Sequence, residues 1–173
     1  LCSSPRSPQA REWKMRHFTV VLIIGLLAGC QFPTPRELTP EQEASIQRDI
    51  DSLTMEWWNA WSTFDWDRGL SFIADGPKTT WTGAVRTLYS VDEMRQVWTE
   101  AMGGLSRQEL EFTNSRTVVL APDIVWTLRE GEARIFDDAG AMVSEGQFIE
   151  TAVWVKREGE WKILLGHDDD STP

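Results

Sequence analysis

Residues 151–167 read TAVWVKREGEWKILLGH. On either side of Glu158-Gly159, apolar residues alternate with other residue types, and this period of two is typical of β-strands with one buried face. Glu158-Gly159 indicates a tight hairpin turn, because glycine tolerates the positive φ that such turns require. We therefore expect a long strand over 142–156 that pairs antiparallel with a last strand over 161–167.

The period of two continues upstream of this hairpin. Two more strands are expected over 110–120 and 124–136, separated by a turn at Pro122-Asp123. Strands that follow one another through tight turns pair antiparallel. The carboxyl-terminal half of the chain therefore predicts an antiparallel meander that ends with the hairpin.

The preceding segment has a helical period. Apolar residues recur at three- and four-residue spacing over 41–64, which predicts a long amphipathic helix, and Thr39-Pro40 is typical of a capped helix start. A short helix is expected over 65–75, a pair of short strands over 79–89 and a third helix over 90–102. A curved sheet wrapped around the first helix buries the apolar faces of both, so the expected class is α+β.

The domain ends in a motif made of Thr151, Val153, Trp154, Val155, Lys156, the Gly159 turn, Trp161, Lys162, Ile163 and His167. With the order of the elements, this motif resembles the nuclear transport factor 2-like superfamily, and within it the SnoaL-like group. The resemblance covers about residues 41–168. It implies a cone-shaped fold with a curved antiparallel sheet, a pocket between sheet and helices, and frequent dimerisation through the sheet. It implies no single activity, because the superfamily includes isomerases, cyclases, hydrolases, dehydratases and many non-enzymes.

A separate pattern precedes the domain. Met15 is followed by a short basic head and an apolar run over 18–27, shorter than the roughly 20 residues that span a bilayer. The run ends in LAGC, which resembles the lipobox of bacterial lipoproteins and implies a lipid on Cys30. The alternatives are an ordinary secretory signal with a chance cysteine, or a buried apolar helix. With Gln31 after the cysteine, the resemblance implies the cell envelope, at the outer membrane facing the periplasm.

These patterns predict four parts of the chain. Residues 1–29 form an upstream extension and a signal peptide, with Met15 as initiator, and residues 30–40 form a lipidated Pro-rich tether. Residues 41–168 form the folded domain, and residues 169–173 form a frayed polar tail.

Composition limits the partners of the domain. A net charge of −10 repels nucleic acid, so we expect no nucleic-acid partner. Neither Cys2 nor Cys30 lies within the folded domain, and the acidic run at 168–170 is expected to stay solvated, so we predict no metal and no cofactor. Ten Trp against one Tyr indicate a bulky aromatic core, an aromatic-lined pocket, or both.

His167 is the only histidine of the predicted domain. It shares parity with Trp161, Ile163 and Leu165, so it lies at the mouth of the cone if that face lines it. There it would act as a general base. The alternative is a surface histidine at a strand end.

The ligand-binding residues that we expect are Trp61, Trp81, Trp98, Trp126, Gln147 and Thr151. Gln147 and Thr151 share parity with apolar neighbours, and polar groups on a buried face require partners. The alternative is that this face points outward. Arg129 and Glu150 are expected to form a cross-strand pair at the surface rather than a buried one.

The leading hypothesis is a membrane-anchored lipoprotein whose domain binds a small apolar or aromatic ligand in a Trp-rich cone without catalysis. One alternative is an isomerase-, cyclase- or hydratase-type enzyme that uses His167 as general base. The other is a homodimeric interaction module at the membrane.

Overall fold

The computed structural model describes residues 37–83 and 86–171, which contain three helices and a sheet of six strands. The elements are α2 (Pro40–Ser62), α3 (Trp66–Ser71), β1 (Thr80–Thr82), β2 (Thr87–Leu88), α4 (Val91–Ala101), β3 (Leu105–Ala121), β4 (Ile124–Asp137), β5 (Met142–Arg157) and β6 (Glu160–Ser171). The predicted signal peptide and Cys30 lie outside the described residues. No described helix is long and apolar enough to span a membrane.

The long first helix, α2, begins and ends close to the predicted positions. Thr39 caps it by accepting a hydrogen bond from the backbone N–H of Gln42, while the Gln42 side chain accepts one from the Thr39 backbone. This capping box satisfies donors that have no partner within the helix, and Pro40 fits the first turn because its missing N–H is not needed there. Ser90 caps α4 by accepting a hydrogen bond from the backbone N–H of Glu93, and the Glu93 side chain accepts one from the backbone N–H of Tyr89.

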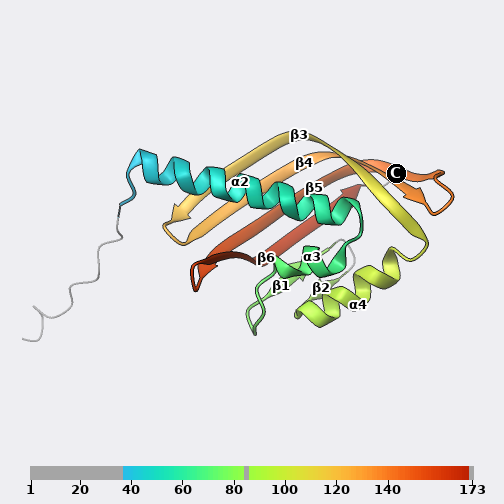
Figure 1. Cartoon of the computed structure of the whole chain (residues 1–173), viewed down its shortest axis with the longest axis horizontal. Coiled ribbons are helices and arrows are strands. Elements are labelled where there is room, and N and C mark those ends of the chain that lie inside the picture. The colour runs from blue at the N-terminus through green and yellow to red at the C-terminus, as the bar shows by residue number, and fades with distance from the viewer. Residues whose placement is uncertain (1–36, 84–85, 172–173) are drawn as a thin grey trace, which may run out of the picture. The chain divides into compact units, whose positions relative to one another are not determined.

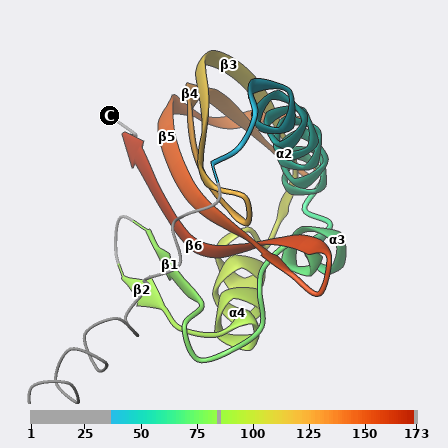
Figure 2. The same cartoon turned by 90° about the vertical axis from the view of Figure 1, so that its left-hand side faces the viewer.

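The sheet has the strand order β2-β1-β6-β5-β4-β3. The long strands β3 to β6 form the antiparallel meander that the sequence predicts. The short strand β1 pairs parallel with β6, so the sheet is mixed, and the expectation of a wholly antiparallel sheet is wrong at this edge. A long connection separates β1 from β6 in the chain, so no tight turn sets their relative direction. Figure 2 shows β1 beside β6.

The strand β6 is longer than expected and continues to Ser171. Asp169 pairs with Ile149, and Ser171 with Gln147, on β5. The prediction of a frayed tail over 169–173 is therefore wrong for residues 169–171. The physical reason is that β5 is long and leaves backbone groups to be paired beyond His167, and paired backbone groups outweigh the polar character of the side chains.

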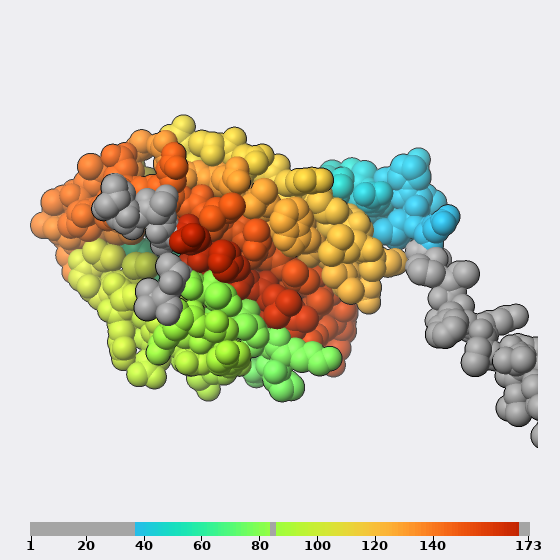
Figure 3. Space-filling model, turned by 180° about the vertical axis from the view of Figure 1, so that it is seen from behind, coloured from blue at the N-terminus to red at the C-terminus, as the bar shows by residue number. Residues whose placement is uncertain are grey.

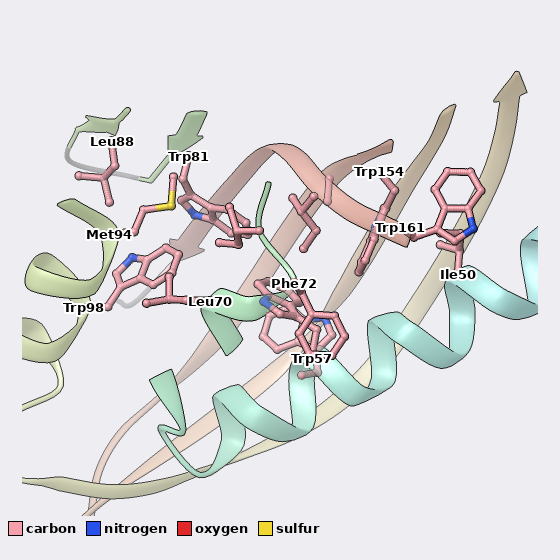
Figure 4. Close-up of a cluster of buried hydrophobic side chains, with 14 of the residues drawn as sticks. Ile50, Trp57, Leu70, Phe72, Trp81, Leu88, Met94, Trp98, Trp154 and Trp161 are labelled. Carbon is pink, nitrogen blue, oxygen red and sulfur yellow. The ribbon is translucent and has the colours of Figure 1, made fainter. Parts of the chain in front are cut away.

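The helix α2 lies along one face of the curved sheet (Figure 1), and the core lies between the sheet and the helices. Figure 4 shows side chains from α2, α3, α4 and the strands meeting in this layer. Trp57 of α2 and Trp154 of β5 are 1% and 0% exposed. The Trp154 indole donates to the Thr127 hydroxyl over 3.3 Å, so the deepest ring on the sheet also has its polar atom paired.

Candidate functional site

A cavity of about 140 Å³ lies between the inner face of the sheet and the helices. Its lining combines aromatic rings with a few polar groups: Trp57, Trp58, Trp61, Trp81, Trp98, Met102, Gln108, Leu110, Ala133, Ile135, Ser144, Gly146, Gln147, Phe148, Glu150 and Asp168. Pockets that combine a largely apolar wall with a few convergent polar groups are typical of small-molecule sites.

One wall of the cavity is built by tryptophans from three elements. Trp57, Trp58 and Trp61 belong to the last turns of α2, where residues four apart lie on the same helix face. The ring centroids of Trp61 and Trp98, from α4, are 4.6 Å apart. The ring centroid of Trp81, from β1, lies 5.4 Å from that of Trp57 and 5.5 Å from that of Trp98. Each of these rings packs against at least one other ring, so the wall is already formed before a ligand binds.

A row of charged residues crosses the three neighbouring strands β4, β5 and β6. Arg129 is the register partner of Glu150, and Glu150 is the register partner of Asp168. Arg129 and Glu150 are 3% and 1% exposed, so the expectation of a surface pair is wrong. Both lie under α2, on the same face as Val125 and Trp154, and that position removes them from water.

The guanidinium of Arg129 is engaged away from Glu150. It donates to the Asp51 carboxylate over 2.9 Å, to the Thr117 hydroxyl over 3.2 Å, and to the backbone carbonyl oxygens of Arg116 and Leu128. These contacts fix the arginine at the junction of α2 with β3. Glu150 therefore has the positive charge nearby but not in direct contact, and its Oε2 atom has no hydrogen-bond partner.

The carboxyl of Glu150 is strongly perturbed. Burial raises its pKa to about 8, because a carboxylate loses its hydration in this position. The charge of Arg129 acts in the opposite direction and the nearby Asp168 carboxylate raises the pKa further. The proximity of the Trp58 indole N–H, which does not reach hydrogen-bond geometry, lowers it. At neutral pH most molecules with an empty cavity therefore carry a protonated Glu150. A perturbed carboxyl in a cleft is a typical sign of a functional site.

Asp168 is the second acidic group at the cavity. It is half-buried, and the indole N–H of Trp81 donates to its Oδ1 atom. A Cβ built on Gly83 would lie 3.6 Å from its Oδ2 atom. The Asp168 carboxylate therefore lies at the side of the cavity next to β1, where its hydrogen bond fixes its position relative to the Trp81 ring.

The predicted ligand-binding residues fall into two groups. Trp61, Trp81 and Trp98 line the cavity, and Gln147 also borders it although it is exposed and has the strand parity of Thr151. Trp126 and Thr151 do not line it. Along β5 the buried side chains are Phe148, Glu150, Ala152 and Trp154, so the parity that contains Thr151 points to the other face. Trp126 lies on that other face of β4.

His167 is exposed and is not part of the cavity lining. A β-bulge interrupts β6 at Leu164, where the pairing with β5 shifts by one residue. Ile163 before the bulge and Gly166 after it are buried, whereas Leu165 and His167 are exposed. One extra residue exchanges the two faces of a strand, so the prediction that His167 faces the cone is wrong. The same bulge turns Asp168 towards the cavity.

Sequence reasoning missed Glu150 and Asp168 as site residues. Phe148, Glu150, Ala152 and Trp154 alternate along β5, but the opposite parity is at least as apolar, so the pattern favours the wrong face. The acidic run that begins at Asp168 is typical of a solvated tail, so nothing in the local sequence marks Asp168 as a site residue. Within residues 37–83 and 86–171, no three His, Cys, Asp or Glu side chains are grouped to hold a metal ion.

The SnoaL-like domain family matches residues 50–168, well over half of the chain. The search of curated proteins found no significant match to this chain. Similar solved structures include a ketosteroid isomerase-like protein from Erwinia carotovora atroseptica (15% identity, TM-score 0.62, 73% of this chain and 97% of that chain). A candidate dehydratase of the NTF2-like family from Streptomyces avermitilis has 14% identity and a TM-score of 0.63, over 76% and 98% of the two chains.

The association domain of calcium/calmodulin-dependent protein kinase II from C. elegans is also similar, with 17% identity and a TM-score of 0.60 over 74% of this chain and 98% of that one. At such identities these structures show a shared fold and no more. The family match and the fold agree with the helices, the curved sheet and the cavity described above. The chain belongs to the SnoaL-like domain family and has the nuclear transport factor 2-like fold.

Proposed function

We propose that the domain binds a small, mainly apolar molecule with one polar end in the Trp-lined cavity. The observation that carries the proposal is a cavity of about 140 Å³ with a rigid aromatic wall and two carboxyl groups at one side. A cavity of similar size, about 150 Å³, accommodates benzene in an engineered protein. The expected ligand is therefore no larger than a single ring with a short substituent.

Replacing Trp98 by leucine is expected to weaken binding of such a ligand by about tenfold or more, because a ring of the wall is lost and truncated aromatic contacts typically carry more than 1 kcal/mol. Saturable quenching of Trp fluorescence, titrated with a set of single-ring compounds, measures the effect. Trp126→Leu is the matched control, since Trp126 lies on the opposite face of the sheet. An equal loss in both variants, or no saturable quenching of the unaltered protein, contradicts the proposal.

An acid–base enzyme is the second candidate function. It is favoured by the neighbouring carboxyls of Glu150 and Asp168, because two groups in different environments can give and take a proton. The ketosteroid isomerase-like protein and the candidate dehydratase share the fold. In this reading Glu150 is the acid and Asp168 the base, and His167 has no role. Loss of turnover without loss of binding in Glu150→Gln, on any substrate found by the titration, separates this function from binding alone.

We also propose that the uncovered face of the sheet forms a homodimer. Figure 3 shows β3 to β6 at the surface when the molecule is seen from behind. Ile149 and Leu165 of this sheet are 37% and 42% exposed. An association domain shares the fold. Light scattering distinguishes a monomer from a dimer by mass. A monomer mass at high protein concentration excludes the dimer.

We further propose that a lipid on Cys30 anchors the protein to the outer membrane of a bacterial envelope. The support is the LAGC sequence directly after an apolar run. Cys30→Ser is expected to move the protein from the detergent-rich to the aqueous phase in detergent phase partitioning, since a thioether-linked lipid can no longer form. Thr34→Ser, a change within the predicted tether that leaves the Cys30 thiol in place, is the control. A variant that stays in the detergent-rich phase contradicts lipidation at Cys30.

A further inference from the structure

The cavity contains acidic groups and no basic ones. Glu150 and Asp168 line it, and no Lys, Arg or His does so among the described residues. Arg129, the nearest cation to Glu150, is held by Asp51 at 2.9 Å and lies outside the lining. The only charged groups that a bound anion would meet in this lining are carboxyl groups, whereas a bound cation would be attracted to them. The charge of the site therefore selects against anionic ligands.

The aromatic wall also favours a cationic ligand. Trp57, Trp58, Trp61, Trp81 and Trp98 line the cavity, and the indole face is the best of the protein side chains at attracting a cation. Such contacts strengthen when the cation is removed from water, as it would be here. Trp81 also holds the Asp168 carboxylate through its indole N–H, so a ring and a negative charge act at one place.

Glu150 brings to the cavity a buried carboxyl oxygen that has no hydrogen-bond partner. Its side chain is 1% exposed and its Oε2 atom makes no hydrogen bond. Buried polar atoms are usually paired, and an unpaired one reduces stability. A cation in the cavity would place a compensating positive charge beside this carboxyl.

We propose that the ligand is a small alkylated ammonium ion, whose charged head lies among the indoles and against Glu150 and Asp168. This inference rests on the proposed binding function and names its ligand class. Alkylation follows from the lining: a bare ammonium needs several hydrogen-bond acceptors, whereas methyl groups on nitrogen suit aromatic walls.

Binding of such a cation should depend on pH. The charged groups near Glu150 are Asp168 from β6 and Arg129 from β4, with Asp51 of α2 behind the arginine. Burial raises the pKa of Glu150 to about 8, so at neutral pH the cation replaces a proton. Affinity should therefore rise as the pH rises from 6 to 8, by up to about tenfold per pH unit, and level off above that range.

The test compares choline with its uncharged isostere, 3,3-dimethyl-1-butanol, by isothermal titration calorimetry on the full chain. Choline is expected to bind at least about tenfold more tightly, because only it carries the charge. Asp168→Asn is expected to lower choline affinity about tenfold while leaving the isostere unaffected. Asp169→Asn is the control, since Asp169 is the exposed neighbour on the same strand. Asparagine keeps an oxygen that can accept from Trp81, so the variant preserves the wall.

The outcomes separate this inference from the proposed function. If the isostere or phenol binds as tightly as choline, the ligand class is wrong and the binding function stands. If choline, the isostere and phenol all fail to bind to a protein of native circular dichroism, both are wrong. Equal losses in Asp168→Asn and Asp169→Asn also overturn the cation site, because they indicate a general effect of surface charge.

Discussion

Replacing Glu150 by glutamine is expected to raise the free energy of unfolding at pH 9 by about 3–5 kcal/mol, and to change it little at pH 4. In the folded chain the pKa of Glu150 is raised from 4.5 to about 8, first by burial. The folded state therefore keeps a proton that the unfolded state loses as the pH rises above 4.5. The contribution of this carboxyl to stability is complete below that pH and is lost as the pH rises to about 8. Glutamine has nearly the same shape and cannot ionise.

Urea unfolding of both proteins at several pH values between 4 and 9 measures the effect. The difference between the two free energies should grow steadily between pH 5 and 8 and then remain constant. Glu111→Gln, at an exposed position of β3, is the control and should shift stability by only a few tenths of a kcal/mol. A constant difference between Glu150→Gln and the unaltered protein over the whole range would show that Glu150 is already ionised in the fold.

Replacing Gly166 by alanine is expected to destabilise the fold by about 3 kcal/mol and to abolish ligand binding, because overpacking a rigid site forces its neighbours apart. A Cβ at this position would lie 2.2 Å from the Cε3 and Cζ3 atoms of the Trp81 ring. The ring cannot yield easily, since it packs against Trp57 and Trp98. Displacing it would also break its hydrogen bond to Asp168.

Urea unfolding and a choline titration at neutral pH check this prediction. Gly103→Ala is the matched control, because a Cβ there meets its nearest atom at 3.5 Å, an ordinary contact. The double variant with Trp81→Leu should lose less stability than the sum of the two single variants, since the smaller side chain leaves room for the methyl group. Additive losses would show that Trp81 is not what excludes a side chain at Gly166.

Local sequence patterns account for most of the elements. The capped start at Thr39 and the period of α2 placed the long helix to within a few residues. The turn at Glu158-Gly159 and the period of two placed the meander and the final hairpin. These features arise from interactions between residues close in the chain, so they can be recognised without knowing the rest of the fold.

The site was less accessible to such reasoning. The structure brings Trp61, Trp81, Trp98 and Gln147 into the cavity lining. Gln147 has the same strand parity as Thr151, so the parity argument that selects it does not explain its place there. Trp126 and Thr151 were placed on the wrong face. On β5 both parities contain apolar side chains, and a strand pattern alone does not say which face the helices cover.

What the sequence by itself determined was the order of helices and strands, the strand pairing of the meander and the aromatic character of the interior. Only the tertiary structure decided which face of the sheet became the cavity. The bulge at Leu164 turned His167 outward and Asp168 inward, and the packing of α2 over β4 and β5 buried Glu150 beside Arg129. The physical reason is that burial and charge pairing depend on residues far apart in the chain, whereas period and capping do not.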